Sequence, residues 1–206
     1  MCKKLVIIGA GGHGRVVADI AKLNNYTSIS FLDDAPGAVE CSGYPVVGQV
    51  KDAVQYPDCE FAVAIGNAAV RREKQELVAS LGGRPATLIH PGAVIADDVV
   101  IGAGTVIMAG AVVNPGAVIG KGCIVNTCAS VDHDCVLADW VHIAVGAHLA
   151  GAVTVGEGTW IGVGAVVSNH VSITGGCMIG AGAVVVGDLN ESGTYIGVPA
   201  RKKAEE

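Results

Sequence analysis

The chain has 206 residues, a formal net charge of −6, 51% hydrophobic residues and 30 glycines, but only 4% aromatic residues. The length suits one large domain or two small ones, and the acidic balance without clustered Lys and Arg argues against nucleic acid and anionic membranes as partners. Many glycines among Val, Ile and Ala favour short strands and tight turns over helical bundles. The apolar N-terminal run is too short for a signal-peptide core, which predicts a cytoplasmic protein. Seven cysteines without a CxxC pair predict free thiols.

Residues 1–84 alternate strand and helix patterns. The segments LVII, TSISFLDD and CEFAVAIGN predict three strands, and a glycine loop followed by a helix lies between the first two. A second helix is predicted over AVRREKQELVASLGG, with Val70, Leu77, Val78 and Leu81 on one apolar face and glycines at its end. This order predicts an α/β domain with a small parallel sheet, half of a Rossmann-like fold.

The first loop contains a possible phosphate-binding motif. Gly9, Gly11 and Gly14 fit G-x-G-x-x-G between a strand and a helix, and Asp33 and Asp34 end the next predicted strand. Glycines let the backbone approach a pyrophosphate, and the helix N-terminus favours negative charge. A plain tight turn and a dehydrogenase are the alternatives. Fewer than about 90 residues make only half of a dinucleotide fold, so we interpret the loop as a nucleotide diphosphate site.

Residues 85–190 show a repeat of six. Every sixth residue from Ile89 to Val185 is aliphatic, and the residues four positions later, from Ala93 to Leu189, are uncharged. This pattern predicts a left-handed parallel β-helix of hexapeptide repeats, with three hexads to a triangular coil and the aliphatic residues stacked inside. The glycine that often follows the aliphatic residue is expected to adopt positive φ at the corner. Three inward cysteines are assigned to the core: Cys123, Cys135 and Cys177.

The histidines near the middle of the repeats are candidates for chemistry. Register places His133 and Asp134 just past an inward valine, so both should point outward near a corner. His142 and His148 directly precede inward aliphatic residues and should also face outward, with a partner subunit needed to enclose His142 and His133. An imidazole beside a carboxylate suits proton transfer near neutral pH. His148 is interpreted as a solvated surface residue.

Several motifs together resemble a bacterial family of sugar acetyltransferases, which includes UDP-4-amino-sugar N-acetyltransferases and sialic acid O-acetyltransferases. The motifs are GAGGHG, FLDD, AIGN, the hexapeptide array, NTCASVDHDC and GVPAR, and they span essentially the whole chain. The resemblance implies a homotrimer of left-handed β-helices that takes acetyl from acetyl-CoA in a cleft between neighbouring subunits. The N-terminal domain would hold the UDP of the acceptor.

The resemblance also implies roles for single residues. His133 matches the general base, and Asp134, where family members commonly have Glu, would orient it. Gly151 would provide the oxyanion-stabilising backbone N–H and contact the cofactor, His142 would help to hold the acetyl donor or acceptor, and Asn126 would line the sugar pocket. The residues matched to nucleotide binding are Gly11, Gly12, His13, Asp33, Asp34, Gly66 and Asn67.

The C-terminal segment, residues 191–206, is expected to fray at its last turn but to contribute to CoA binding. Lys121 is the only basic residue between Ile89 and Asn190, so cations for the CoA phosphates must come from elsewhere. The residues predicted for this role, or for the loop beside it, are Gly197, Pro199, Ala200, Arg201, Lys202 and Lys203. A solubilising tail is the alternative interpretation.

The sequence thus favours transfer of acetyl from acetyl-CoA to the 4-amino group of a UDP-linked 4-amino-4,6-dideoxy sugar, by direct attack in a ternary complex. Sialic acid O-acetylation is the nearest alternative. A zinc enzyme of the γ-carbonic anhydrase kind is a third hypothesis, with His133, His142 and His148 as ligands. That chemistry leaves Asp134 and the nucleotide domain without a role, and we expect no metal site.

Overall fold

The computed structural model describes residues 3–35, 37 and 39–204. The chain forms two compact units, residues 1–91 and 92–206. None of the described helices is both long and apolar enough to cross a membrane.

The first unit is an α/β domain around a parallel sheet of order β2-β1-β5-β6. Its elements are β1 (Lys3–Ile8), α1 (Gly12–Leu23), β2 (Tyr26–Leu32), β3 (Glu40–Cys41), β4 (Tyr44–Pro45), the 3₁₀ helix η1 (Val50–Gln55), β5 (Glu60–Val63), α2 (Ala68–Ser80), β6 (Arg84–Pro85) and β7 (Leu88–Ile89). The three predicted strands and two helices are therefore confirmed. The hairpin β3–β4 and η1 were not predicted, because each is too short to show a period.

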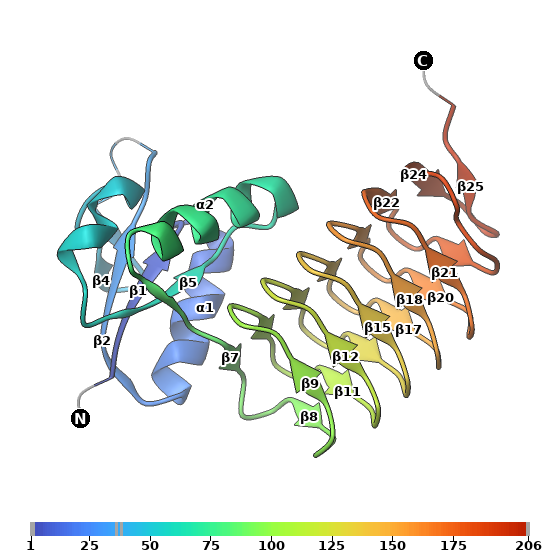
Figure 1. Cartoon of the computed structure of the whole chain (residues 1–206), viewed down its shortest axis with the longest axis horizontal. Coiled ribbons are helices and arrows are strands. Elements are labelled where there is room, and N and C mark those ends of the chain that lie inside the picture. Colours follow the sequence, from blue (N-terminus) through green and yellow to red (C-terminus); the bar gives the residue numbers. More distant parts are fainter. Residues whose placement is uncertain (1–2, 36, 38, 205–206) are drawn as a thin grey trace. The chain divides into compact units, whose positions relative to one another are not determined.

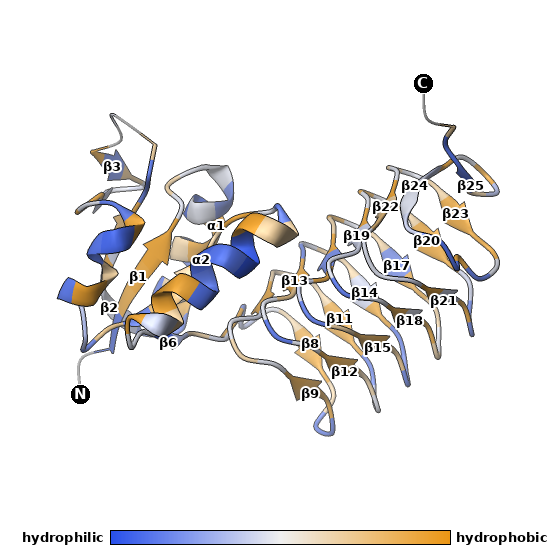
Figure 2. Cartoon of the chain, turned by 45° about the horizontal axis from the view of Figure 1, so that its top comes forward, coloured by the Kyte–Doolittle hydropathy of each residue, from blue (hydrophilic) through white to orange (hydrophobic). Residues whose placement is uncertain are grey.

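The α1 helix packs against β1 and β2, whereas α2 packs against η1, β5 and β6. Val6, Phe61 and Val78 belong to the cluster that joins the sheet to α2 and η1. The predicted apolar face of α2 is only partly correct: Val78 is buried, but Val70 and Leu81 are exposed. Much of α2 is hydrophilic, in contrast to the hydrophobic β1 (Figure 2).

The second unit is a triangular parallel β-helix whose coils stack as successive rungs (Figure 1). The first face carries β10 (Val106–Ile107), β13 (Ile124–Val125), β16 (His142–Ile143), β19 (Trp160–Ile161), β22 (Cys177–Ile179), β24 (Gly193–Ile196) and β25 (Arg201–Lys202). The second face carries β8 (Val94–Ile95), β11 (Val112–Val113), β14 (Ser130–Val131), β17 (His148–Leu149), β20 (Val166–Val167) and β23 (Val184–Val185). The third face carries β9 (Val100–Ile101), β12 (Val118–Ile119), β15 (Val136–Leu137), β18 (Thr154–Val155) and β21 (Ser172–Ile173). The predicted left-handed β-helix is confirmed.

The core of the β-helix consists of the two inward positions of each hexad. Residues at the first position are buried from Ile107 to Val185, and those at the second from Thr105 to Leu189. Threonine is tolerated there because its hydroxyl is satisfied: Thr159 donates to the Thr174 carbonyl and accepts from the Cys177 N–H. The inward cysteines are buried as predicted, and Cys135 donates its S–H to the carbonyl of Ala150.

The corner geometry differs from the prediction. The glycine directly after the aliphatic residue does not adopt positive φ; an added Cβ at Gly102, for example, would overlap the backbone of Gly120 in the next coil. Positive φ falls two residues later, as at Gly104 (φ 76°). The first glycine therefore allows close stacking of coils, and the second makes the turn.

The last turn was predicted to fray, but it is hydrogen-bonded as far as Lys203, and residues 205–206 lie outside the described residues. Chain segment β24 pairs with β22 on one side and antiparallel with β25 on the other, and the Val198–Pro199 peptide bond between them is cis. Lys203 N–H bonds to the Thr194 carbonyl at 2.7 Å. The tail is thus a hairpin that closes the end of the β-helix.

Candidate active site

His133 and Asp134 lie in the turn between β14 and β15, which joins the second face to the third. Their side chains are 58% and 69% exposed, so the predicted outward orientation is confirmed. The imidazole Nδ1 lies 2.9 Å from Asp134 Oδ2. Asp134 occupies the corner position with φ 58°, a conformation that Asp tolerates better than most residues. The corner therefore places the carboxylate beside the ring.

Two carboxylates make His133 more basic. The hydrogen bond that Asp134 accepts from Nδ1–H raises the pKa of His133, and the negative charges of Asp132 and Asp134 add to the effect. Asp132 is itself held by Asn114 Nδ2 and by the His133 backbone N–H, both at 2.7 Å, and these bonds lower its pKa. Sequence reasoning missed Asp132 as a contributor, although its position on the other side of His133 in DHD was the available signal.

Gly151 lies one coil further along, directly beside the His133 ring. An added Cβ at Gly151 would overlap the imidazole, with Nε2 as the nearest atom, and the neighbouring Ala152 N–H bonds to the His133 carbonyl at 2.8 Å. The structure therefore brings together His133, Asp134 and Gly151, the three residues predicted to be catalytic. Nε2, the ring nitrogen away from Asp134, is the one that lies over Gly151.

His142 lies in β16 and its surroundings differ from the prediction. Its side chain is only 5% exposed, its ring packs on Trp160 with centroids 4.3 Å apart, and Nε2 lies 3.2 Å from Asn126 Nδ2. The expectation that a partner subunit would be needed to enclose His142 is wrong, because residues of its own chain cover it. His148, in contrast, is exposed as predicted and contacts Ser130 Oγ through Nδ1 at 2.8 Å.

Within one chain, His133 and His142 do not share a site. His133 lies in the turn between the second and third faces, whereas β16 belongs to the first face, opposite that turn. The buried stack of Val131, Leu137 and Ile143 separates them. Any reaction that uses both histidines requires them from different copies of the chain.

The glycine loop of the first unit has the geometry expected of the motif. Helix α1 begins at Gly12, and an added Cβ at Gly14 would overlap the Gly9 carbonyl, so glycine there permits close packing of helix and strand. Asp33 Oδ2 accepts a bond from the Ala10 N–H at 2.6 Å and therefore anchors the loop. Asp34 binds the Val50 N–H and Lys74 Nζ, and these bonds lower the pKa of its carboxyl.

A buried arginine that sequence reasoning missed supports the turn that follows β5. Arg71 is 1% exposed and donates to the carbonyls of Ile65 and Gly66 at 2.9 and 2.6 Å, which fixes the turn between β5 and α2. Asn67, which follows Gly66, caps the N-terminus of α2: its side-chain oxygen accepts a hydrogen bond from the Val70 N–H at 3.1 Å. No sequence signal distinguishes Arg71 from Arg72 beside it.

The charge of Arg71 also affects His13. Burial, and secondly the positive charge of Arg71, lower the pKa of His13 to about 4, so the ring is neutral at physiological pH. Its Nε2 is buried and has no hydrogen-bond partner in the described part of the chain. The residues predicted to contact the nucleotide thus lie where α1 begins after β1 (Gly11, Gly12 and His13) and just before α2 begins after β5 (Gly66 and Asn67).

Three of the predicted tail residues, Ala200, Arg201 and Lys202, line a cavity of about 260 Å³ together with Asp188 and Tyr195, whereas Gly197, Pro199 and Lys203 do not line it. Lys202 Nζ is 2.8 Å from Glu191 Oε2, and Arg201 bonds to the Ala200 carbonyl. Both side chains are exposed. The cavity therefore has both basic residues, Arg201 and Lys202, and an acidic one, Asp188, in its lining.

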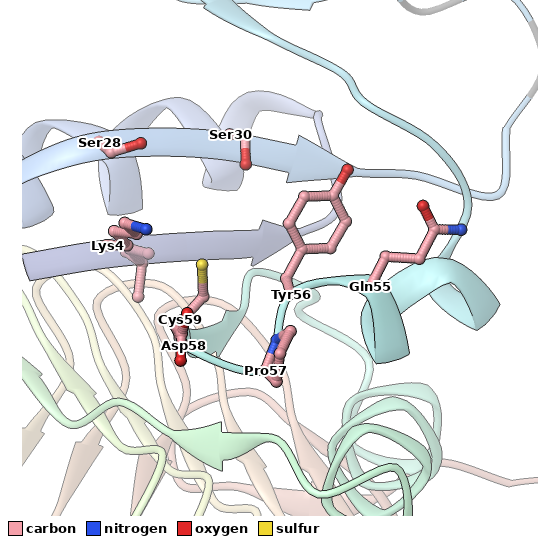
Figure 3. Close-up of a pocket in the computed structure, with 9 residues that line it drawn as sticks. Lys4, Ser28, Ser30, Gln55, Tyr56, Pro57, Asp58 and Cys59 are labelled. Carbon is pink, nitrogen blue, oxygen red and sulfur yellow. The ribbon is translucent and has the colours of Figure 1, made fainter.

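A second cavity of about 260 Å³ lies in the first unit and contains none of the predicted site residues (Figure 3). Lys4, Ser28 and Ser30 come from β1 and β2, and Tyr56 and Cys59 come from the segment before β5. The predicted nucleotide residues follow the carboxyl ends of β1, β2 and β5, whereas Lys4 and Ser28 lie near the starts of their strands. This cavity is therefore separate from the candidate nucleotide site.

Comparisons with known proteins agree with this architecture. A family model described as the PglD N-terminal domain matches residues 4–78, and one described as bacterial transferase hexapeptide (six repeats) matches residues 85–115. The GDP-perosamine N-acetyltransferase of Escherichia coli O157:H7 is 31% identical over 156 residues, 72% of this chain and 71% of the relative. The UDP-N-acetylbacillosamine N-acetyltransferase of Bacillus subtilis is 37% identical over 105 residues, about half of each chain (48% and 49%).

Solved structures are similar over the whole chain. The acetyltransferase domain of PglB from Neisseria gonorrhoeae, in complex with acetyl coenzyme A, has a TM-score of 0.95 and 43% identity, covering 98% of this chain and 100% of that one. Perosamine N-acetyltransferase from Caulobacter crescentus, in complex with CoA and GDP-perosamine, has a TM-score of 0.95 and 36% identity, covering 100% and 99%. The chain therefore belongs to the bacterial family of hexapeptide-repeat sugar N-acetyltransferases with a PglD-type N-terminal domain.

Proposed function

We propose that this protein transfers acetyl from acetyl-CoA to the 4-amino group of a UDP-linked 4-amino-4,6-dideoxy sugar, with His133 as general base. The observation that carries the proposal is the placement of His133 Nε2 directly beside Gly151 while Nδ1 contacts Asp134. Because Asp134 accepts a hydrogen bond from Nδ1–H, the proton of the neutral ring stays on Nδ1 and Nε2 keeps its lone pair. That nitrogen is accessible to a substrate, since the side chain is exposed.

In the proposed reaction, the neutral sugar amine attacks the thioester carbon. A C–N bond forms, and Nε2 of His133 takes the proton that the amine loses. The backbone N–H of Gly151 stabilises the negative oxygen of the tetrahedral intermediate. The C–S bond then breaks, and the CoA thiolate takes the proton from the imidazolium. A general base of this kind contributes about 10² to 10⁴ in rate.

The first unit is proposed to bind the nucleotide diphosphate. The N–H groups at the start of α1 and the buried guanidinium of Arg71 supply positive potential near Gly12 and His13. Asp33 and Asp34 are proposed to face the nucleoside. A GDP-linked amino sugar is the second candidate, because the Escherichia coli and Caulobacter crescentus relatives are named for GDP-perosamine. O-acetylation would need the same base to activate a hydroxyl.

We propose a cytoplasmic homotrimer with each active site between two subunits. His133 and His142 lie on opposite sides of one β-helix, so a shared site needs His142 and Asn126 from a neighbour. Val100, Val118 and Val136 form an exposed apolar row on the third face, which supports burial against another copy. The C-terminal hairpin, with Arg201 and Lys202, is proposed to bind the CoA phosphates.

The test combines ligand binding with product analysis. UDP- and GDP-linked 4-amino sugars and acetyl-CoA are screened by thermal shift, since ligands that bind the folded state raise the melting temperature. Product mass then identifies N-acetylation or O-acetylation. His133→Ala should lower kcat by about 10² to 10⁴ and leave the nucleotide-sugar thermal shift intact. Undiminished activity of this variant across the pH range would contradict the assignment of the base.

A further inference from the structure

The Asn126 carboxamide bridges a backbone N–H and the buried ring of His142. Its Oδ1 accepts from the Thr127 N–H at 2.8 Å, and its Nδ2 lies 3.2 Å from His142 Nε2. A backbone N–H can only donate, so the oxygen of the carboxamide must face Thr127. The NH₂ group must then face His142, because the opposite orientation would set two donors against each other at Thr127.

This orientation decides the protonation of the ring. An NH₂ group can only donate, so His142 Nε2 must be the acceptor and carry no proton. The proton of the neutral ring is then on Nδ1, and the imidazolium form, with N–H at both positions, would break the contact. Burial of His142 and packing on Trp160 hold the ring in this orientation. Thus the basic nitrogen of His142 is already occupied.

We propose that Asn126 is a positioning residue that keeps His142 neutral, with its proton on Nδ1, so that His142 acts as a hydrogen-bond donor and not as a base. This inference rests on the proposed function for its use in acetyl transfer. The Nδ1 of His133 contacts a carboxylate, but the His133 side chain is 58% exposed, and among the described residues no side-chain amide bonds to its Nε2. One coil therefore holds one histidine that can accept a proton, His133, and one that can only donate a hydrogen bond, His142. The contact with the carboxamide of Asn126 causes this difference.

The direct test is nuclear magnetic resonance of the full-length protein labelled with ¹⁵N-histidine. Long-range ¹H–¹⁵N correlations distinguish protonated from unprotonated ring nitrogens, and the His142 signals are assigned by their absence from a His142→Gln variant and by elimination with variants of exposed histidines. We expect Nδ1 protonated and Nε2 unprotonated at neutral pH. A proton on Nε2 of His142 in the unmutated protein would overturn the proposal. This result does not depend on any acetyl transfer.

The functional part is tested with Asn126→Asp. The carboxylate can still accept from Thr127, but its other oxygen now faces Nε2 and requires a proton there. The ¹⁵N spectrum should show Nε2 protonated, and kcat should fall about 10²-fold, whereas Asn169→Asp, the same change at an exposed site, should alter neither. A reversed protonation pattern with undiminished kcat would overturn the role of the tautomer. If the unmutated protein shows the expected spectrum but acetylates no nucleotide amino sugar, the proposed function fails and the assignment of the tautomer stands.

Discussion

Two histidines of one coil have surroundings that set their chemistry apart. His133 is exposed and has a carboxylate on either side of it in the sequence, whereas His142 is buried between Trp160 and an amide. Carboxylates stabilise the protonated ring, and an amide donor stabilises the neutral one. At the scale of the residue, we therefore expect His133, and not His142, to be able to act as a base.

The pH dependence of activity should report the carboxylate of Asp134. The pKa of His133 is raised mainly by this hydrogen bond, and only the deprotonated ring can act as base, so kcat/KM should rise with pH through that raised pKa. Asp134→Asn removes the largest cause, and the rising limb should move to lower pH. The plateau should also fall, by a factor of about 10 or more, because the base is weaker and less well oriented.

The measurement is the pH–rate profile of kcat/KM for the two proteins. Asp139→Asn is the matched control, since it removes the same charge from the next corner turn, where Asp139 pairs with Lys121. An equal displacement of the limb in both variants would mean that overall charge, and not the contact with His133, sets the profile.

Gly151 should be sensitive to a single methyl group. Its φ is not positive, so alanine is compatible with the backbone, but the added Cβ would overlap the His133 ring. The exposed ring can turn away, so we expect little loss of stability but a loss of kcat of about 10² or more, the scale of a lost base. In a His133→Ala background, Gly151→Ala should cause no further loss. Steady-state kinetics of the double-mutant cycle check this, and additive effects would contradict it.

At the scale of the element, the hexad repeat predicted the fold because the core contacts of a β-helix join residues at a fixed, short separation in the sequence. Every inward side chain contacts its equivalents one coil away, so the period alone gives the register, as in the pairing of Ile119 with Leu137. Asn126, Thr127 and Trp160 show where this reasoning ends. Their contacts with one another or with His142 depend on side-chain directions outside the core, which no period encodes.

The first unit shows the same limit. Its strands and helices follow from apolar patterns, but burial of Arg71 does not, because a charged residue in a helix is ordinarily assigned to solvent. Arg71 is buried because its guanidinium donates hydrogen bonds to two backbone carbonyls in the turn after β5, and these contacts are known only from the structure. Likewise, residue identity could suggest His133 and Asp134 as a pair, but not the support of Asp132 by Asn114.

The corners of the β-helix offer a stability test of backbone conformation. One coil, with Cys128, Asp134 and Trp140, has no glycine at any of its three corner positions with positive φ. This coil carries His133, so strain is concentrated where the candidate site lies. Ala152, one coil above Asp134, shares the conformation with φ 58°.

Ala152→Gly should raise the free energy of unfolding by about 0.5–1 kcal/mol, because a positive φ penalises a Cβ. Ala181→Gly is the matched control: it makes the same change in a turn, at a residue without positive φ, and should lower stability by a similar amount. Chemical denaturation of both variants measures the two values. If both variants changed the free energy of unfolding in the same direction, the positive φ at the corner would not be what governs the effect.

At the scale of the whole molecule, the decisive prediction concerns how many copies make one site. The turn of His133 lies opposite the face of His142, so His133→Ala and His142→Ala should damage different components of a site shared by two subunits. Co-expression of the two variants with different tags, and purification through both, yields only mixed assemblies. In a cyclic trimer, each mixed assembly has one site with both histidines intact, so activity should recover to about one third of the unmutated value. Each variant co-expressed with a differently tagged copy of itself should stay inactive. If the mixed trimers are no more active than these controls, the two histidines do not meet between subunits, and the shared site is contradicted.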